Sequence, residues 1–203
     1  MEGRAGLLWL GVVSYLVYTF LIYAFAVRHN RLFLPYVAVL GLSTWALAGG
    51  LFATDARDLV RRLAAGAPVR TAALLLLVLG ALFYALWLAE EIPAALAGVV
   101  PSGVADNELI TNPVHVVDLA LMLPAMIAAG WWLWRREPRG LVAAPVVLAN
   151  ALCQNAAIAT MMVWAIRAGQ PGEPAMVAVF AVLAGLVAVV LVRLLAAIDA
   201  AEE

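Results

Sequence analysis

Six long apolar runs, separated by short polar segments, make up most of the 203-residue chain. A helix needs about 20 apolar residues to cross the hydrocarbon core of a bilayer, and each run is close to that length. Because backbone polar groups find no water in lipid, such runs are predicted to be helices. The predicted spans are residues 7–27, 32–52, 71–89, 113–134, 141–166 and 175–195. We therefore expect an all-α polytopic membrane protein with one six-helix transmembrane domain.

The composition agrees with this pattern and excludes several classes of protein. Hydrophobic residues make up 67% of the chain and charged residues 12%, whereas soluble domains have about half and a quarter. The lipid bilayer is therefore the expected surrounding, and a net charge of −1 gives no support for a nucleic-acid partner. The absence of Lys excludes a Schiff-base cofactor, and the single Cys153 excludes an internal disulfide. The first run is longer than a signal-peptide core, so we expect an uncleaved span.

The arginines are distributed very unequally between the two sides that six spans define. One side carries nine of them, namely Arg4, Arg57, Arg61, Arg62, Arg70, Arg135, Arg136, Arg139 and Arg193. The other side carries Arg28, Arg31 and Arg167. By the positive-inside rule, both termini are predicted to be cytoplasmic. The exclusive use of Arg over Lys is typical of a GC-rich bacterial genome, so the expected location is the bacterial cytoplasmic (inner) membrane, with several passes.

Two connections are longer than the others. Residues 53–70 predict a short amphipathic helix on the cytoplasmic surface, capped by Thr54, in which Asp58 pairs with Arg61 or Arg62. Its arginines, Arg57, Arg61 and Arg62, are expected to lie near anionic lipid headgroups. Residues 90–112 predict an acidic extracytoplasmic loop. This loop carries Glu90, Glu91, Asp106 and Glu108 and no arginine.

The segment N-P-V-H-V-V-D-L, from Asn112 to Leu119, is the clearest candidate for chemistry. Asn112 is predicted to cap a helix that has Pro113 at its first position. His115 and Asp118 are three residues apart and therefore share a face, with Asp118 about 8 Å inside the outer boundary. An ionisable residue within a span is a functional candidate because its burial costs several kcal/mol. The alternative is that Asp118 only fixes helix packing through a bond to His115 or an Arg.

Further polar residues are expected to gather near this pair. Glu90 and Glu91 end the third span on the same side, where a carboxylate close to Asp118 could carry a proton. Asn150 and Gln154 share a face near the middle of the fifth span. They could line a ligand path, or they could hold helices together through interhelical hydrogen bonds. Tyr18 belongs to the polar face of the first span. Pro124 is predicted to kink the fourth span and free a backbone carbonyl that a hydroxyl or ligand could use.

No cofactor is predicted, although two arrangements of residues could hold a metal. Met122 and Met126 continue the face of His115 and Asp118, and soft sulfur ligands suit Cu(I). The M-x-x-x-M spacing is similar to that of trimeric copper-uptake channels, but it covers five residues, and methionine is a common core filler. His29 and His115 both lie toward the outer side and could in principle hold haem iron.

The N-P-x-H-x-x-D-L segment, followed by the R-R-E-P-R-G turn, resembles small bacterial multi-span membrane proteins of unknown role. The resemblance implies no activity, and it favours Asn112, His115 and Asp118 as signature positions.

Three functions remain open. The leading hypothesis is a polar pocket on the extracytoplasmic side that binds or translocates a small solute or ion, in a process that could be proton-coupled. The first alternative is a membrane enzyme that uses acid–base or metal chemistry on a lipid-like substrate. The second is an accessory or scaffold subunit without activity of its own. Small residues on the spans are compatible with a homo-oligomer.

Overall fold

The computed structural model describes residues 3–106, 109–170 and 172–198, and within these ranges the chain forms helices and turns without any strand. The elements are α1 (Gly3–Ala26), α2 (Phe33–Ala53), α3 (Ala56–Arg61), α4 (Val69–Ala97), α5 (Ser102–Ala105), α6 (Pro113–Val117), the π-helix η1 (Asp118–Met122), α7 (Leu123–Trp134), α8 (Pro138–Arg167) and α9 (Pro174–Ala196). Elements α6, η1 and α7 form one continuous rod. With this rod counted once, six helices of the described chain are long and apolar enough to cross a membrane. The predicted all-α, six-span fold is confirmed.

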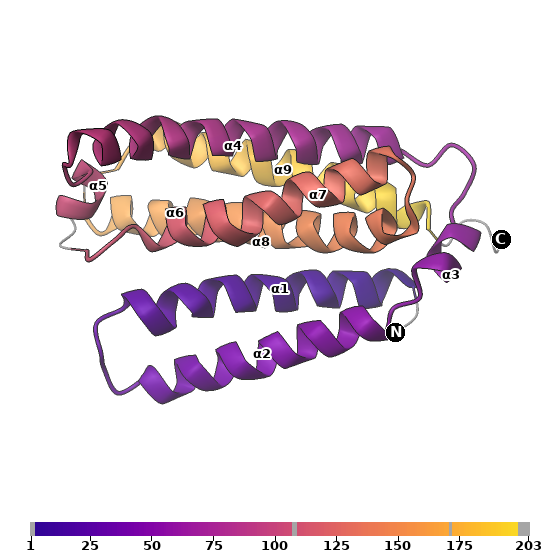
Figure 1. Ribbon diagram of the computed structural model, residues 1–203, viewed down its shortest axis with the longest axis horizontal. Helices are drawn as coiled ribbons and strands as arrows, with labels where there is room; N and C mark the ends of the chain where they lie inside the picture. The colour runs from indigo at the N-terminus through magenta and orange to yellow at the C-terminus, as the bar shows by residue number, and fades with distance from the viewer. Residues whose placement is uncertain (1–2, 107–108, 171, 199–203) are drawn as a thin grey trace.

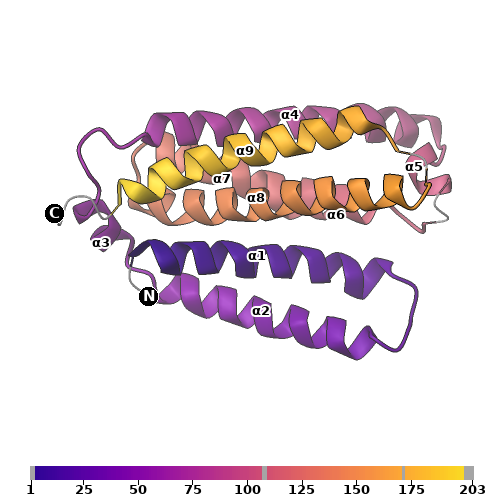
Figure 2. The same cartoon turned by 180° about the vertical axis from the view of Figure 1, so that it is seen from behind.

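The helices form a bundle with a hairpin beside it (Figure 1). Helices α4, α8 and α9 and the α6–η1–α7 rod make up the bundle, whereas α1 and α2 form the hairpin, with α1 between α2 and α8. The N-terminus, α3 and the C-terminal end lie together, and α5 lies at the opposite end (Figures 1 and 2). We call these the α3 end and the α5 end. Both ends of the chain therefore lie on the same side of the predicted membrane.

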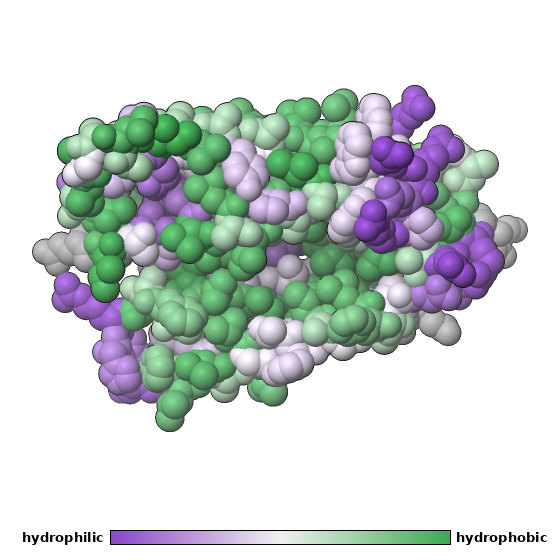
Figure 3. Space-filling model, viewed as in Figure 1, coloured by the Kyte–Doolittle hydropathy of each residue, from purple (hydrophilic) through white to green (hydrophobic). Residues whose placement is uncertain are grey.

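The distribution of polar residues changes along the line from the α3 end to the α5 end. On the face that Figure 3 shows, hydrophobic residues cover the middle of the molecule, and hydrophilic residues gather at the α3 end and, in a smaller group, at the opposite end beside the turn between α1 and α2. The large exposed side chains include Phe52, Leu34 and Trp45, which are 93%, 73% and 79% exposed. Such exposure would be unfavourable in water but suits lipid, which is as apolar as these side chains.

Helix α8 is the central element, because its first half is buried almost continuously from Gly140 to Ala151. Close approach to α8 depends on small residues, as expected in lipid, where packing rather than the hydrophobic effect holds helices together. A Cβ at Gly11 of α1 would collide with the side chain of Ala149, and a Cβ at Gly140 would collide with the backbone of Leu133. Residues 14 and 18 of α1 lie one and two turns beyond Gly11, so the docking directs Ser14 and Tyr18 toward the bundle.

The segment predicted as a loop at residues 90–112 is partly helical. Helix α4 continues past the predicted end at residue 89 to Ala97, with Pro93 inside it, and α5 forms a short turn at Ser102–Ala105. The alanines after Pro93 favour helix, and Gly98 ends it in the left-handed conformation at φ 65°. Glu90 and Glu91 thus belong to α4 and not to a loop, while Glu108 lies outside the described residues.

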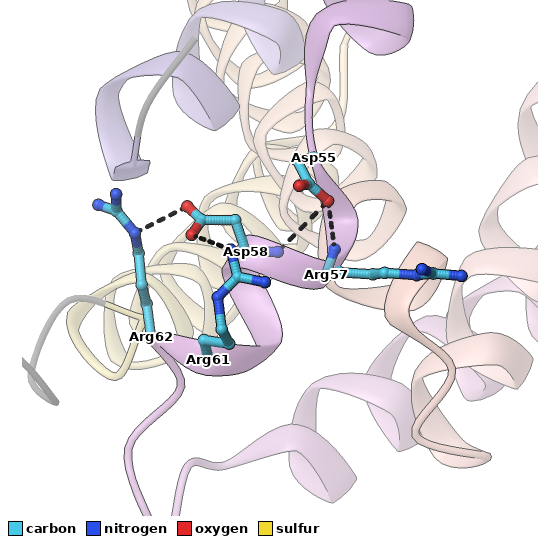
Figure 4. Close-up of polar contacts among 5 residues, drawn as sticks. All are labelled: Asp55, Arg57, Asp58, Arg61 and Arg62. Atoms are coloured by element: carbon cyan, nitrogen blue, oxygen red, sulfur yellow. Dashed lines mark hydrogen bonds and ion pairs between the residues drawn. The ribbon is translucent and has the colours of Figure 1, made fainter.

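Helix α3 forms where an amphipathic surface helix was predicted, but its cap is different. Asp55, not Thr54, is the N-cap, and its carboxylate accepts hydrogen bonds from the backbone N–H groups of Arg57 and Asp58 (Figure 4). The Thr54 hydroxyl instead donates to the carbonyl of Gly50 within α2, at 2.8 Å, because Thr54 still lies within reach of the last turn of that helix.

The fourth span changes its hydrogen-bond register at η1. The N–H of Leu123 donates to the carbonyl of Asp118, five residues earlier. In the same register the carbonyl of Leu119 faces Pro124, which has no N–H to donate. The hydroxyl of Tyr84 donates to this carbonyl instead, at 2.7 Å. The predicted effect of Pro124, a carbonyl freed for a neighbouring hydroxyl, is confirmed.

Candidate functional site

Asp118 is the first residue of η1, and each of its carboxylate oxygens accepts one hydrogen bond. The Tyr18 hydroxyl of α1 donates to Oδ1 at 3.0 Å, and Nε1–H of Trp87 in α4 donates to Oδ2 at 2.9 Å. Both donors are neutral. Among the described residues, Asp118 forms no ion pair with an arginine or a histidine. The carboxylate is therefore positioned by three helices, and its two hydrogen-bond donors carry no charge.

His115 and Glu91 form a second pair next to this carboxylate. Nδ1 of His115 lies 2.6 Å from Oε1 of Glu91, which makes Nδ1 the N–H donor when Glu91 is ionised. The imidazole is only 5% exposed, whereas Glu91 is about one third exposed. The ring of Trp87 lies against that of His115, with 4.3 Å between their centroids. Trp87 thus contacts both Asp118 and the His115–Glu91 pair and joins them into one polar cluster.

The cluster continues into α8. Gln154 lies near Tyr18, and the amide nitrogen of Asn150 donates to Oγ of Ser14 at 2.9 Å. Asn150 is 1% exposed, and its Oδ1 has no hydrogen-bond partner among the residues that the structure describes. Buried polar atoms nearly always find a partner, since an unsatisfied one costs about 1–3 kcal/mol. This oxygen is therefore the unusual atom of the cluster.

Two cavities lie along the contact between α1 and the fourth span. The smaller one, of about 140 Å³, is bounded by Ser14, Val17, Tyr18, Leu21, Val117, Leu121, Met122, Ala125 and Asn150. The larger one, of about 680 Å³, lies at the α5 end and is lined mainly by apolar residues from the end of α1 and the start of α6. Leu21 and Val117 border both, so the two cavities are neighbours along one line from the α5 end toward the middle of the span.

The structure brings together most, but not all, of the candidate residues. Asp118, His115, Glu91, Tyr18, Asn150 and Gln154 form or adjoin the polar cluster. Asn112 caps α6, as predicted, with its side chain accepting from the N–H groups of Val114 and His115. Glu90 points away from the cluster toward α5, where its Oε1 would lie 3.7 Å from a Cβ on Gly103. A helix turns by about 100° per residue, so adjacent Glu90 and Glu91 face different directions.

The metal candidates are spread over different surroundings. Met126 is buried in the core against α4, Met122 borders the small cavity, and His29 packs on Phe33 in the turn after α1. Over residues 3–106, 109–170 and 172–198 there is no group of three or more His, Cys, Asp or Glu side chains that could hold a metal ion.

Two residues of the cluster were not among the candidates. Tyr84 and Trp87 precede Glu91 by seven and four residues, and these spacings place all three on one face of α4. That pattern was visible in the sequence, although aromatic residues on a span are ordinary lipid-facing or core residues. Only the contact with the fourth span marks them as donors to Leu119 and Asp118.

The arrangement provides a membrane-embedded carboxylate with two neutral donors, an adjacent histidine–carboxylate pair and an unpartnered amide oxygen. Such groups can take up a proton or a cation, relay a proton, or accept a hydrogen bond from a ligand. No family model, curated protein or solved structure matches this chain.

Proposed function

We propose that the protein binds and translocates a small solute or ion, entering from the α5 end, with Asp118 as the site of a coupled proton or cation. The observation that carries the proposal is the placement of Asp118: Tyr18 and Trp87 hold its two oxygens, and no described cation pairs with it. An ionised carboxylate in a span needs a counter-charge, because burial without one costs several kcal/mol. A bound proton or small cation would supply it.

The neighbouring groups suit a path that leads to and from Asp118. Glu91 is about one third exposed, and His115 contacts both Glu91 and Trp87. In this proposal Glu91 receives the proton or cation at the α5 end, and His115 relays a proton or tunes the field at Asp118. Gln154 and Asn150 line the inner part of the path, next to Tyr18 and Ser14.

The orientation and location belong to the same proposal. The α3 end carries most of the arginines of the chain, which supports a cytoplasmic α3 end and an extracytoplasmic α5 end. An all-arginine basic set supports a bacterial inner membrane. Arg57 is exposed, and Arg61 and Arg62 flank Asp58, so α3 presents a net positive surface to anionic headgroups (Figure 4).

A membrane enzyme is the second candidate, and the larger cavity favours it. A groove of about 680 Å³ with an apolar lining could take part of a lipid-like substrate, and Val117 on its wall is adjacent in sequence to Asp118. In that case His115 and Glu91 would act as an acid–base pair. Tightly bound lipid that a phospholipid-turnover assay shows to be modified would favour this candidate over translocation.

The scaffold alternative predicts a different arrangement of the same polar side chains. A purely structural cluster is expected to pair all its buried polar atoms. Oδ1 of Asn150 has no partner in the described part of the chain, and the smaller cavity adjoins the cluster at Ser14, Tyr18 and Asn150. These observations support a ligand-binding role over a scaffold role.

The test is a thermal-unfolding screen of the purified protein against monovalent and divalent cations and small solutes over a range of pH. A ligand that binds only the folded protein raises the melting temperature as it saturates its site. We expect a ligand that stabilises the unaltered protein and the Glu90→Gln control but not Asp118→Asn. Glu90 is a fair control because it lies at the same end and faces α5. Stabilisation that persists in Asp118→Asn, or no stabilisation by any ligand, would contradict the proposal.

A further inference from the structure

The turn between α7 and α8 combines tryptophan and arginine side chains at the α3 end (Figure 1). Between residues 131 and 139 the chain places Trp131, Trp132, Trp134, Arg135, Arg136 and Arg139, and Arg70 of α4 lies beside them. Three guanidinium groups lie over indole rings, at 5.8 Å for Arg70 and Trp134, 5.6 Å for Arg135 and Trp131, and 4.2 Å for Arg139 and Trp132. Tryptophan is typical of the membrane–water interface, and a cation–π contact holds each guanidinium at that level.

The charge of this turn is only partly balanced. Its one acidic residue, Glu137, is committed mainly to Arg139, whose Nε and Nη2 both lie 2.6 Å from Oε2. Nε of Arg135 lies 3.9 Å from Oε1 of the same carboxylate, and its side chain is 60% exposed. No described side chain forms an ion pair with Arg70 or Arg136, which are both exposed. The turn therefore presents a net positive charge.

The backbone holds Arg136 in a conformation that favours glycine. Its φ is 57°, in the left-handed region, where an L side chain is strained. The N–H of Arg136 donates to the carbonyl of Leu133, and the N–H of Glu137 donates to that of Trp132, which is the pattern of a Schellman motif. Glycine is the usual residue at this position of the motif. A strained arginine there indicates that its side chain has a role beyond ending the helix.

The two exposed tryptophans show which kind of anion suits the turn. Trp131 and Trp134 are 49% and 45% exposed, and their spacing of three residues places them on one face of a membrane span. A soluble anion would contact the arginines and leave these rings unused. A phospholipid has an anionic phosphate for a guanidinium, which binds phosphate oxygens through its planar set of N–H donors, and apolar chains for the rings.

We propose that the α7–α8 turn binds one anionic phospholipid, whose phosphate is held by Arg135 and whose acyl chains pack against Trp131 and Trp134. Arg70 and Arg136 supply the surrounding positive charge. The site differs from the surface of α3, where Asp58 pairs with two of the arginines. The inference rests on the membrane placement of the spans, and it is independent of any role of Asp118.

Lipid titration tests the proposal. The full chain in a neutral detergent is titrated with phosphatidylglycerol or with phosphatidylcholine of the same acyl chains, and native mass spectrometry measures the lipid-bound fraction. We expect one phosphatidylglycerol to bind in preference to phosphatidylcholine. Arg135→Gln should weaken this binding about tenfold, because it removes hydrogen bonds between charged groups.

Two control variants separate a defined site from a diffuse positive field. Arg193→Gln removes the same charge from an exposed position near the end of α9, and no described tryptophan ring lies under Arg193. It should weaken binding by less than about twofold, since separated surface charges are screened by salt. Arg135→Lys keeps the charge but loses the planar donor set, and should still weaken binding by about threefold or more. Equal losses in Arg193→Gln and Arg135→Gln, with full binding in Arg135→Lys, would overturn the proposal.

Arg136→Gly distinguishes a lipid site from a structural role of the turn. Glycine relieves the strain at φ 57°, so the melting temperature without lipid should rise, while the loss of a positive charge should weaken phosphatidylglycerol binding. A variant that is more stable and binds the lipid as well as the unaltered protein would contradict the role of Arg136. Inorganic phosphate should not displace the lipid. Displacement by inorganic phosphate alone would mean that the turn binds a free anion, and would overturn the assignment to a phospholipid.

Discussion

Asp118 and Asp58 are both carboxylates with two partners, but they obtain them in different ways. Asp58 pairs with Arg61 and Arg62, three and four residues away on α3, at 2.9 and 2.8 Å (Figure 4). Asp118 is held by Tyr18 and Trp87, which are 100 and 31 residues away on other helices. At the surface, the charge of a carboxylate is balanced by arginines that lie close to it in the sequence. Within the membrane it is positioned by neutral donors that only the packing of helices supplies, and no described arginine or histidine forms an ion pair with it.

This comparison predicts that disturbing helix packing damages the cluster at Asp118 far more than α3. Gly11→Leu should be the most destabilising change, because a side chain there collides with Ala149 and pushes α1, with Tyr18, away from α8. We expect a loss of about 3 kcal/mol in unfolding free energy, at the upper end for overpacking, measured by denaturant titration in micelles. Gly41→Leu on α2 is the matched control, since nothing lies within 4 Å of its Cβ position. Equal losses in both variants would contradict the packing argument.

Removing one donor should have a smaller effect. Trp87→Phe keeps a ring against His115 and Phe83 but leaves Oδ2 of Asp118 without its N–H donor. We expect a loss of about 1 kcal/mol, the net value of a hydrogen bond, and a double-mutant cycle with Asp118→Asn should show coupling of similar size. Trp45→Phe, at a side chain that is 79% exposed, should change nothing. Additive effects of Trp87→Phe and Asp118→Asn would show that the hydrogen bond carries no energy.

Adjacent Glu90 and Glu91 provide a still finer test. Glu91→Gln replaces a carboxylate beside His115 with a neutral amide, and hydrogen bonds to charged groups contribute somewhat more than neutral ones. We expect the unfolding free energy to fall by about 0.5–1 kcal/mol at neutral pH. This is less than a buried hydrogen bond to a charged group contributes, because Glu91 is partly exposed. Glu90→Gln should be silent in the same thermal-unfolding measurement. A larger effect of Glu90→Gln would mean that the α5 contact, and not the histidine pair, matters at this end.

The smallest effect is expected on α3. Asp58→Asn removes both pairs with Arg61 and Arg62, but exposed ion pairs contribute only about 0–1 kcal/mol, so the unfolding free energy should change by less than ~0.5 kcal/mol. The loss of one negative charge should instead strengthen binding to anionic lipid, measured as retention on vesicles with and without phosphatidylglycerol. Destabilisation as large as that of Trp87→Phe would remove the distinction between the two carboxylates.

The sequence by itself determined the membrane class, the six spans, the common side of both termini and the pairing within α3. Each depends on local composition or on spacing along one helix. The thickness of the bilayer sets the length of a span, and helix geometry sets which residues of one helix are neighbours. Sequence also determined that Pro124 would free a carbonyl, because proline lacks an N–H, but the register change at η1 decided that this carbonyl belongs to Leu119. The boundary of the third span could not be placed, since α4 continues through Glu90 and Pro93 on helix propensity after its apolar run has ended.

Only the tertiary structure decided which polar groups meet. Spacing placed His115 and Asp118 on one face, yet they have different hydrogen-bond partners. His115 pairs with Glu91, whereas Asp118 accepts hydrogen bonds from Tyr18 and Trp87. Those partners depend on how far helices rotate and approach, which small residues such as Gly11 control through contacts remote in sequence. Oδ1 of Asn150, which has no partner among the described residues, has the same origin, because only the packing of the helices decides which donors reach a buried amide.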